Sequence, residues 1–443
     1  MPPGGENATF SPVRRGGSGW LFAGAFGAAG TLGVVAAVAL GAGASSCRVY
    51  DTSLLEPAGA GGPDGGSGIG WWSKQRGECY TAGIPTPADR PAPQGDDSVG
   101  PIFLAIRTMR VGSLNTEGRL DANAWKDIGF DLDGKCTSSP TCPSPTPDVG
   151  CKPESAAVAF DGDYCRDNTF GRLEYQAALV PELALKYGFN DDAFNCALCV
   201  GAYNFLIRID GYNGKANDDK VRVDMYPSPG LKDMLPWDCR SPDWKNHPCF
   251  TPDLPWLIQD DVVADKTRSG NAVGPSTIFD AAAYVRDGYV VLRLPEDTIF
   301  WFPGRRALAT AYPLRMKGGI VTAKIGRAQD GTWVISDGII AGRTTKDDFV
   351  HSLRLIGLCE QDKNYGLVQQ YVNGSLDSLA SGAVDPTKPC DSMSLGLGFT
   401  AGQALPGDLV KVEPLVECAG ADAGADSGPP DAASEGGVDA GSD

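Results

Sequence analysis

The chain between residues 100 and 400 is built from short apolar runs separated by Gly, Pro and Asp. The run at 102–111 is rich in apolar, β-prone residues and predicts a strand. Two further runs, 203–210 and 220–226, flank a turn-rich segment and predict a strand, loop, strand unit. In the second half, close spacing of such runs predicts an antiparallel meander, with a returning strand at 393–400; the runs are 289–294, 298–302, 307–316, 319–325 and 332–340.

Two segments have helical periodicity instead. Leu173, Ala177, Val180 and Ala184 follow one another at three- and four-residue steps, which predicts an amphipathic helix over 170–187 with a break at Pro181. A capped helix is expected at 344–356. The 58 Gly and 33 Pro favour a turn-rich fold over a helix bundle. We therefore expect a mainly β fold with a few helices: an antiparallel, β-sandwich-like domain stapled by disulfides.

The first 46 residues are typical of an export signal. A polar stretch with Arg14 and Arg15 precedes an uncharged run at 20–44 that is rich in Ala, Gly, Val and Leu. A retained membrane anchor is the alternative, although the Ala and Gly content makes the run only mildly apolar. The expected organisation is a signal segment at 1–46, a flexible tether at 47–70, a β-rich domain at 71–418 and a disordered acidic tail at 419–443. A boundary between two subdomains near 136–153 is an option.

The run ends in Ala44-Ser45-Ser46-Cys47, which resembles the lipobox of bacterial lipoproteins. In that motif small residues precede a cysteine that is lipidated and becomes the new N-terminus. Ala44 stands where the motif prefers Leu. The resemblance implies lipidation of Cys47, an anchor in the membrane and an extracytoplasmic location in the cell envelope.

The cysteine count agrees with export. Thirteen cysteines leave twelve if Cys47 carries lipid, and an even set is expected to form disulfides in an oxidising compartment. Cys239 and Cys249 are a candidate local pair across a Pro-rich loop. A zinc site is disfavoured because His247 and His351 are the only histidines. The predicted disulfide cysteines are Cys79, Cys136, Cys142, Cys151, Cys165, Cys196, Cys199, Cys239, Cys249, Cys359, Cys390 and Cys418.

Net charge excludes one class of partner. At −17, with a pI near 4.6, the chain repels phosphate backbones, so nucleic acid is not expected to bind.

The sequence calls for no cofactor, and calcium is the one that its carboxylates would suit. Two Gly-containing segments close to cysteines supply Asp131, Asp133, Asp161, Asp163 and Asp167, and hard cations take several oxygen ligands. The spacing does not complete an EF-hand loop, and Asp and Gly in turns are the simpler interpretation. The spelling Asp131-Leu132-Asp133-Gly134 also occurs in phosphohydrolases of the haloacid dehalogenase type, but the residues before it are too polar for the buried strand that such a nucleophile follows.

Three tryptophans fall in a Pro-rich segment with two cysteines. If exposed, Trp237, Trp244 and Trp256 would offer flat rings for binding a glycan or an envelope protein. The alternative is that the rings fold inward and cover a sheet, since large aromatics are mostly buried.

Several segments resemble an uncharacterised family of exported proteins from myxobacteria. They are scattered across residues 125–400: Gly129–Cys136, Arg166–Asn168, Arg208–Gly214, Asp337–Arg343 and Pro389–Leu395. The resemblance implies export and a shared fold, and it identifies no catalytic residue.

No catalytic motif is readable. Two histidines leave few ways to build a nucleophilic triad, and the C-x-x-C pair Cys196 and Cys199 lacks the flanking residues of a redox site. We expect a surface-tethered binding or structural module. The alternative is a secreted hydrolase using a carboxylate pair.

Overall fold

The computed structural model describes residues 70–418, except for 94, 96, 143–147, 155–159, 188–190, 240, 271 and 304–312. The contacts divide the chain into Met1–Arg48 and Val49–Asp443, and the description below concerns the second unit. Cys47, the signal segment, residues 47–69 of the tether and the acidic tail lie outside the described residues. None of the helices in the described part combines the length and hydrophobicity that a membrane crossing requires.

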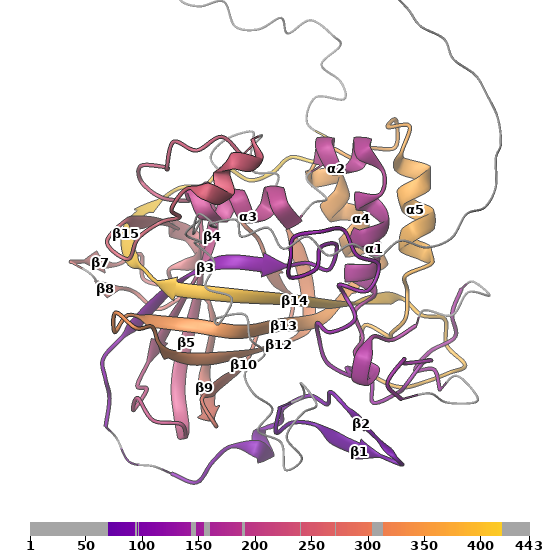
Figure 1. Cartoon of the computed structure of the whole chain (residues 1–443), viewed down its shortest axis with the longest axis horizontal. Helices are drawn as coiled ribbons and strands as arrows, with labels where there is room; N and C mark the ends of the chain where they lie inside the picture. Colours follow the sequence, from indigo (N-terminus) through magenta and orange to yellow (C-terminus); the bar gives the residue numbers. More distant parts are fainter. Residues whose placement is uncertain are drawn as a thin grey trace, which may run out of the picture. The chain divides into compact units, whose positions relative to one another are not determined.

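One large antiparallel sheet dominates the domain (Figure 1). Its strand order is β10-β9-β5-β4-β3-β14-β13-β12-β11, and β10 also pairs with β12. The strands are β3 (Ile102–Arg110), β4 (Asn204–Asp210), β5 (Asp218–Ser228), β9 (Ile278–Arg286), β10 (Tyr289–Arg293), β11 (Thr298–Phe300), β12 (Leu314–Arg327), β13 (Trp333–Thr345) and β14 (Ser392–Gln403).

The pairing of β10 with β12 closes eight of these strands into a barrel, so the predicted sandwich is wrong. The 14-residue β12 is long enough to pair with β11 near its start and with β10 further on, where Val291 lies opposite Thr322. Closure leaves no free edge between β10 and β12, whereas a sandwich would leave two separate sheets. The ninth strand, β11, is an extension of the barrel wall.

The predicted mainly β fold with a few helices is confirmed. The runs at 319–325 and the end of 307–316 belong to one strand, β12, which is interrupted by an irregularity between Lys317 and Ile320. Gly318 there has φ +59°, a backbone conformation that favours glycine. Two separate strands were expected because this glycine pair looks like a turn in the sequence.

The core fills the barrel with alternate residues of its strands. On β14 the inward residues are Met393, Leu395, Leu397, Phe399 and Ala401, all at most 3% exposed. The intervening outer positions include Gly396, where an added Cβ would come within 2.9 Å of the Ile128 carbonyl oxygen. Glycine on this outer face therefore lets the loop around residue 128 lie directly against the barrel.

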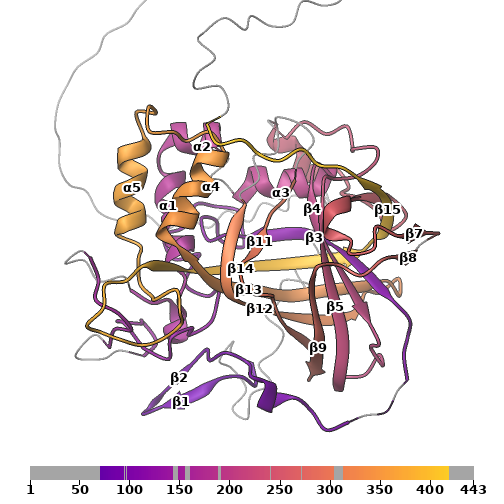
Figure 2. The same cartoon turned by 180° about the vertical axis from the view of Figure 1, so that it is seen from behind.

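Five helices lie together on one side of the sheet, as both views show (Figures 1 and 2). The predicted break at Pro181 separates α1 from α2, because proline cannot donate the hydrogen bond that a continuous helix needs. Thr345 caps α4 by accepting a hydrogen bond from the Asp348 amide at 3.0 Å. The helices are α1 (Thr169–Ala178), α2 (Pro181–Tyr187), α3 (Asp191–Val200), α4 (Lys346–Leu355) and α5 (Tyr365–Asn373).

Smaller elements complete the described chain. A hairpin is formed by β1 and β2, a parallel pair by β6 and β15, and a short ribbon by β7 and β8. Their bounds are β1 (Lys74–Arg76), β2 (Cys79–Thr81), β6 (Pro255–Gln259), β7 (Arg268–Ser269), β8 (Ala272–Val273) and β15 (Leu405–Val410), with 3-10 turns η2 (Pro87–Asp89), η3 (Asp163–Cys165), η4 (Pro242–Asn246) and η5 (Asp260–Val262).

All twelve cysteines from Cys79 to Cys418 lie in pairs at disulfide distance, as predicted, but one predicted pair is wrong. Cys239 bonds to Cys196 and Cys249 bonds to Cys199, so both ends of the Pro-rich loop are attached to α3 rather than to each other. Cys196 and Cys199 consequently do not form a redox C-x-x-C pair with each other. The remaining pairs are Cys79–Cys142, Cys136–Cys165, Cys151–Cys390 and Cys359–Cys418.

Candidate functional site

Three predicted calcium ligands come together beside the barrel. Carboxylate oxygens of Asp131, Asp133 and Asp167 all lie within 4.8 Å of one another. The segments that carry them pair through Phe130 and Asp167, where the Asp167 amide donates to the Phe130 carbonyl at 2.9 Å. Asn168 then caps α1, and its side chain also accepts a hydrogen bond from Gly396 on β14. The start of α1 and the outer face of β14 thus fix the position of these acids.

A fourth and a fifth carboxylate join them around a void of about 10 Å³. Asp161 and Asp377 line this void together with Asp133 and Asp167. We call Asp131, Asp133, Asp161, Asp167 and Asp377 the carboxylate cluster. Asp377 was not predicted, because it lies far along the chain from the other four and outside the two Gly-containing segments.

Asp163, the remaining predicted ligand, is not among the residues that line the void or form the three-carboxylate group. It begins the 3-10 turn η3, in which Tyr164 has φ +56°. Its backbone amide donates to the Lys126 carbonyl at 2.7 Å, so this turn is attached to a different loop. Two residues of separation from Asp161 are therefore enough to remove Asp163 from the cluster.

Backbone amides point at several cluster oxygens. Asp167 Oδ2 accepts from the Leu132 amide at 2.6 Å and the Asp133 amide at 3.3 Å. Asp133 Oδ1 accepts from the Lys135 amide at 2.8 Å, a turn that Gly134 allows with φ +71°. Hydrogen bonds from N–H groups favour the ionised form of a carboxylate.

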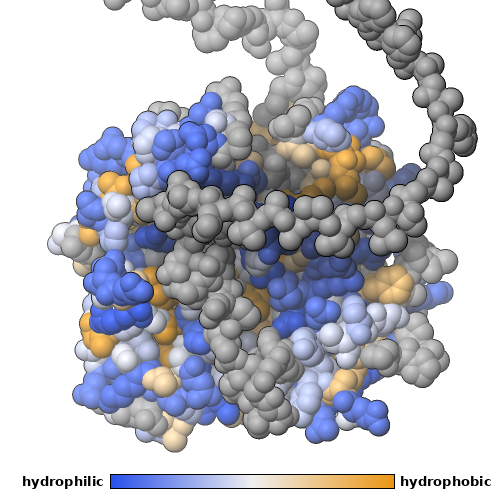
Figure 3. Space-filling model, viewed as in Figure 1, coloured by the Kyte–Doolittle hydropathy of each residue, from blue (hydrophilic) through white to orange (hydrophobic). Residues whose placement is uncertain are grey.

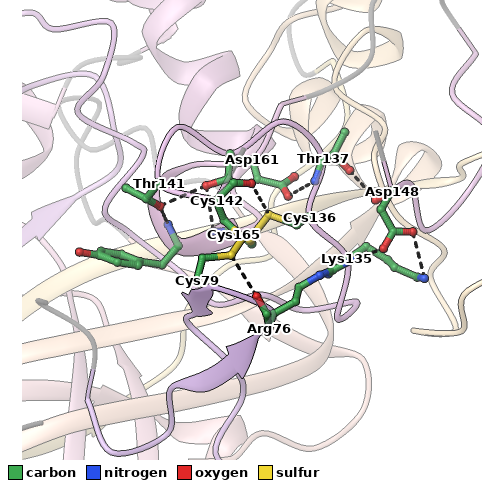
Figure 4. The surroundings of a disulfide bond; sticks show 12 residues. Arg76, Cys79, Lys135, Cys136, Thr137, Thr141, Cys142, Asp148, Asp161 and Cys165 are labelled. Carbon is green, nitrogen blue, oxygen red and sulfur yellow. Dashed lines mark hydrogen bonds and ion pairs between the residues drawn. A yellow bond between two sulfur atoms is a disulfide. The ribbon is translucent and has the colours of Figure 1, made fainter. Parts of the chain in front are cut away.

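Asp161 and Asp377 are held in the same way. Asp161 Oδ2 accepts from the Thr137 amide (Figure 4). Asp377 accepts from both the amide and the hydroxyl of Ser394 on β14, at 2.8 and 2.5 Å. Asp161 and Asp377 are thus positioned by a neighbouring loop and by β14, respectively.

Disulfides clamp these loops. Cys136–Cys165 connects the segment of Asp133 to the segment of Asp161 and Asp167, and Cys79–Cys142 lies next to it (Figure 4). Cys151–Cys390 joins segments 239 residues apart, and both of its cysteines line the void. Separation of the acidic segments would therefore require covalent bonds to break.

Burial and mutual repulsion act on the whole cluster. Asp131, Asp161 and Asp167 are each 6% exposed. Burial, with repulsion from Asp133, raises the pKa of Asp131 to about 7, and burial raises that of Asp377 to about 6. The pKa values of Asp161 and Asp167 are raised well above the ordinary range by the same two causes. Asp133 is the common neighbour, because its charge acts on each of the other four.

Positive charge near the cluster is limited. Burial raises the pKa of Asp133, and the charges of Arg343 and Lys135 oppose that rise. The Arg343 guanidinium donates to the Leu132 carbonyl at 2.6 Å and is 7% exposed. Lys135 and Arg76 both pair with Asp148 at the outer side of the loop (Figure 4). The charge of Arg76 also acts on Asp131, and these three cations do not balance five carboxylates.

One cluster oxygen is left over. Asp131 Oδ1 is buried and has no hydrogen-bond partner among the described residues. A buried unpaired oxygen normally costs stability, so its presence calls for an explanation. On the other side of the cluster, an added Cβ at Gly150 would lie 2.0 Å from Asp133 Oδ2. Backbone therefore approaches the carboxylates as closely as glycine permits.

The predicted tryptophan platform is not formed as a set. Trp256 is 0% and Trp244 4% exposed, so burial leaves neither ring free for a ligand. Trp237 is half-buried, stacks on His247 at 4.1 Å between ring centroids, and donates from Nε1 to the Pro248 carbonyl at 3.0 Å. Trp244 and Trp256 are thus buried by apolar packing and are not exposed to solvent. A binding role for Trp237 stays a prediction.

A second buried acid site was missed by the sequence reasoning. Glu174 on α1 and Asp191 at the start of α3 line an apolar cavity of about 30 Å³ together with phenylalanines that include Phe300 and Phe302. Glu174 is 2% exposed, and its Oε1 has no partner among the described residues. The amphipathic pattern of α1 could have pointed to it, since Glu174 follows Leu173 on the buried face.

The chemistry available to the carboxylate cluster follows from its donors. Five carboxylates offer oxygen ligands only, and the neighbouring sulfurs are engaged in disulfides. Such a set suits a hard cation. Comparison of the chain with protein-family models, curated proteins and solved structures gives no match.

Proposed function

We propose that this chain is an exported protein, tethered to the cell envelope through Cys47, whose disulfide-stapled barrel serves as a binding or structural module outside the membrane. The observation that carries the proposal is the pairing of twelve cysteines in the described domain. Disulfides form and persist mainly in oxidising compartments. The export signal and the lipobox resemblance support the same location.

The geometry of the carboxylate cluster favours a non-enzymatic role over the alternative of a hydrolase. A glycosidase needs two carboxyl groups on either side of a bound sugar, about 5 to 10 Å apart. Four of the five carboxylates instead line a void of about 10 Å³, and three members of the cluster are almost fully buried. A sugar ring does not fit there.

The composition of the surface does not select one class of partner. Hydrophilic residues predominate among the coloured residues on the face that Figure 3 shows, with hydrophobic residues in groups between them. A glycan or an envelope protein remains the class of partner that we propose, with the half-buried Trp237 as the residue to test.

The tether is tested by substitution of the lipidation residue. Cys47→Ser should prevent lipid attachment, so the protein should leave the detergent-soluble membrane fraction or remain as an unprocessed precursor. Ser46→Ala is the matched control, because a small residue is kept before Cys47 and membrane association should persist. Fractionation with intact-mass analysis is the measurement. A wild-type chain recovered without lipid, with Met1 retained and free thiols among the other cysteines, would contradict the proposal.

A further inference from the structure

The carboxylate cluster has more negative charge than its protein surroundings balance. Its oxygens receive hydrogen bonds from the amides of Leu132, Lys135 and Thr137, which favour ionised carboxylates. Arg343 and Lys135 are the cations whose charge acts on Asp133. Full ionisation without another cation would leave several repelling charges close together in a poorly hydrated space.

Two observations besides the acidity point to a bound ion. Asp131 Oδ1 has no partner among the described residues, although Asp131 is 6% exposed and its carboxylate belongs to the three-carboxylate group. The void lined by Asp133 and Asp167, at about 10 Å³, has room for roughly one small sphere and no hydration shell. Asp133 and Asp167 belong both to the three-carboxylate group and to the wall of the void.

We propose that the carboxylate cluster binds one calcium ion, with Asp133 and Asp167 as the central ligands. Calcium accepts six to eight oxygens in flexible geometry, whereas magnesium keeps several waters and demands an octahedron. Zinc and copper prefer nitrogen and sulfur, and the site presents oxygens. The ligand set differs from the sequence expectation, because Asp377 enters and Asp163 leaves.

The ion connects parts of the fold that are distant in sequence. Asp131 and Asp133 lie in one loop, Asp161 and Asp167 precede α1, and Asp377 precedes β14 and is held by Ser394. The barrel, the first helix and the loops of the cluster therefore meet at one point. Calcium there stabilises the folded chain and has no equivalent site once the chain unfolds.

The first measurement is the melting temperature of the oxidised full chain in millimolar calcium, in millimolar magnesium and in chelator. Calcium is expected to raise the melting temperature above the value in chelator, and magnesium to raise it less. The calcium range is chosen because extracellular modules bind this ion with dissociation constants of about 10⁻⁴ to 10⁻³ M. Equal melting in calcium and chelator, or equal effects of the two ions, would overturn the proposal.

Calorimetric titration with calcium then tests the ligands. Asp133→Asn should weaken calcium binding roughly tenfold or more, since even residues that only support a metal ligand cost about 10- to 100-fold. Asp163→Asn is the matched control from the same region and should bind as the wild type does. Unchanged affinity in Asp133→Asn would contradict the assignment.

A folding defect is separated from a binding defect by melting the variants in chelator. Asp133→Asn should then be at least as stable as the wild type, because one repelling charge is gone while Oδ1 still accepts from Lys135. Asp377→Asn is a second ligand variant on a different segment and should lose calcium affinity too. If both variants melt with the wild type in chelator and still bind calcium normally, the site is not where we place it.

Discussion

The protein buries acids in two places and treats them in opposite ways. In the carboxylate cluster, amide groups point at the oxygens and disulfides hold the loops together. In the cavity between α1 and α3, Glu174 lies among apolar side chains and its Oε1 has no partner in the described structure. In the cluster, hydrogen bonds from N–H groups oppose the rise in pKa that burial and repulsion cause, whereas Glu174 Oε1 has no such partner in the described structure.

Asp191 shows the intermediate case. It lines the same cavity as Glu174, but its oxygens accept from the Ser113 hydroxyl at 2.8 Å and from the Val111 amide at 3.3 Å. Burial raises the pKa of both residues, and in Asp191 the hydrogen bonds oppose the rise. Glu174 can keep a proton in its apolar cavity, whereas four members of the cluster accept hydrogen bonds from N–H groups that favour their ionised forms: Asp133, Asp161, Asp167 and Asp377. Hydrogen-bond donors around a buried carboxyl therefore distinguish a candidate cation site from an acid buried in an apolar cavity.

The largest expected effect comes from removing a disulfide beside the carboxylate cluster, compared with removing one that tethers α3. Replacing Cys151 and Cys390 with Ala opens a loop of 239 residues and should lower the free energy of unfolding by about 5 kcal/mol. Replacing Cys199 and Cys249, which tether α3, opens a loop of 50 residues and should cost about 4 kcal/mol. Chemical denaturation measures both.

We expect the two disulfide variants to differ in their affinity for calcium. Cys151 and Cys390 line the void, so their loss should weaken calcium binding by the folded protein. Loss of Cys199–Cys249 should leave calcium affinity unchanged, because neither of these cysteines lines the void. Equal effects on calcium affinity would show that the cluster is not clamped locally.

A smaller effect is expected from Glu174→Gln, and it depends on pH. Burial raises the pKa of Glu174 well above the usual range, with a further contribution from Asp191. The folded state therefore holds a proton that the unfolded state releases above about pH 4.3, so wild-type stability is lost as pH rises, at up to about 1.4 kcal/mol per pH unit. Glu174→Gln removes this loss, and its advantage over the wild type should grow with pH.

Denaturant midpoints of the wild type and Glu174→Gln, measured from about pH 5 to 8, test this pH dependence. Glu117→Gln serves as the control, because the same substitution is made in a side chain that is 60% exposed. A Glu174→Gln variant that tracks the wild type at every pH would mean that Glu174 is ionised in the folded protein.

The sequence predicts the local elements of this fold better than their assembly. Alternating runs locate β3, β4, β5 and β14, and Pro181 marks the end of α1. The inward residues of a strand look the same in a barrel and a sandwich, however, because both bury alternate positions. Only the non-local pairing of β10 with β12 distinguishes them.

The same limit applies to the site. Asp131, Asp133, Asp161 and Asp167 could be found because they fall in two Gly-containing segments near cysteines. Asp377 could not, since Ser394 and the Cys151–Cys390 bond bring it to the void from a distant segment. Nearness in sequence also led to the wrong pairing of Cys239 with Cys249, because two cysteines of α3 form both bonds.

The most direct test of the calcium site is anomalous X-ray scattering from crystals of the oxidised protein grown in calcium. The account predicts one peak between Asp133 and Asp167, with carboxylate oxygens at about 2.3 to 2.6 Å. Oxygens of Asp131 and Asp377 should be among the ligands. Absence of an anomalous peak at the cluster in calcium-grown crystals, with hydrogen-bonded carboxyl pairs in its place, would contradict the central claim and show that protons rather than calcium neutralise these acids.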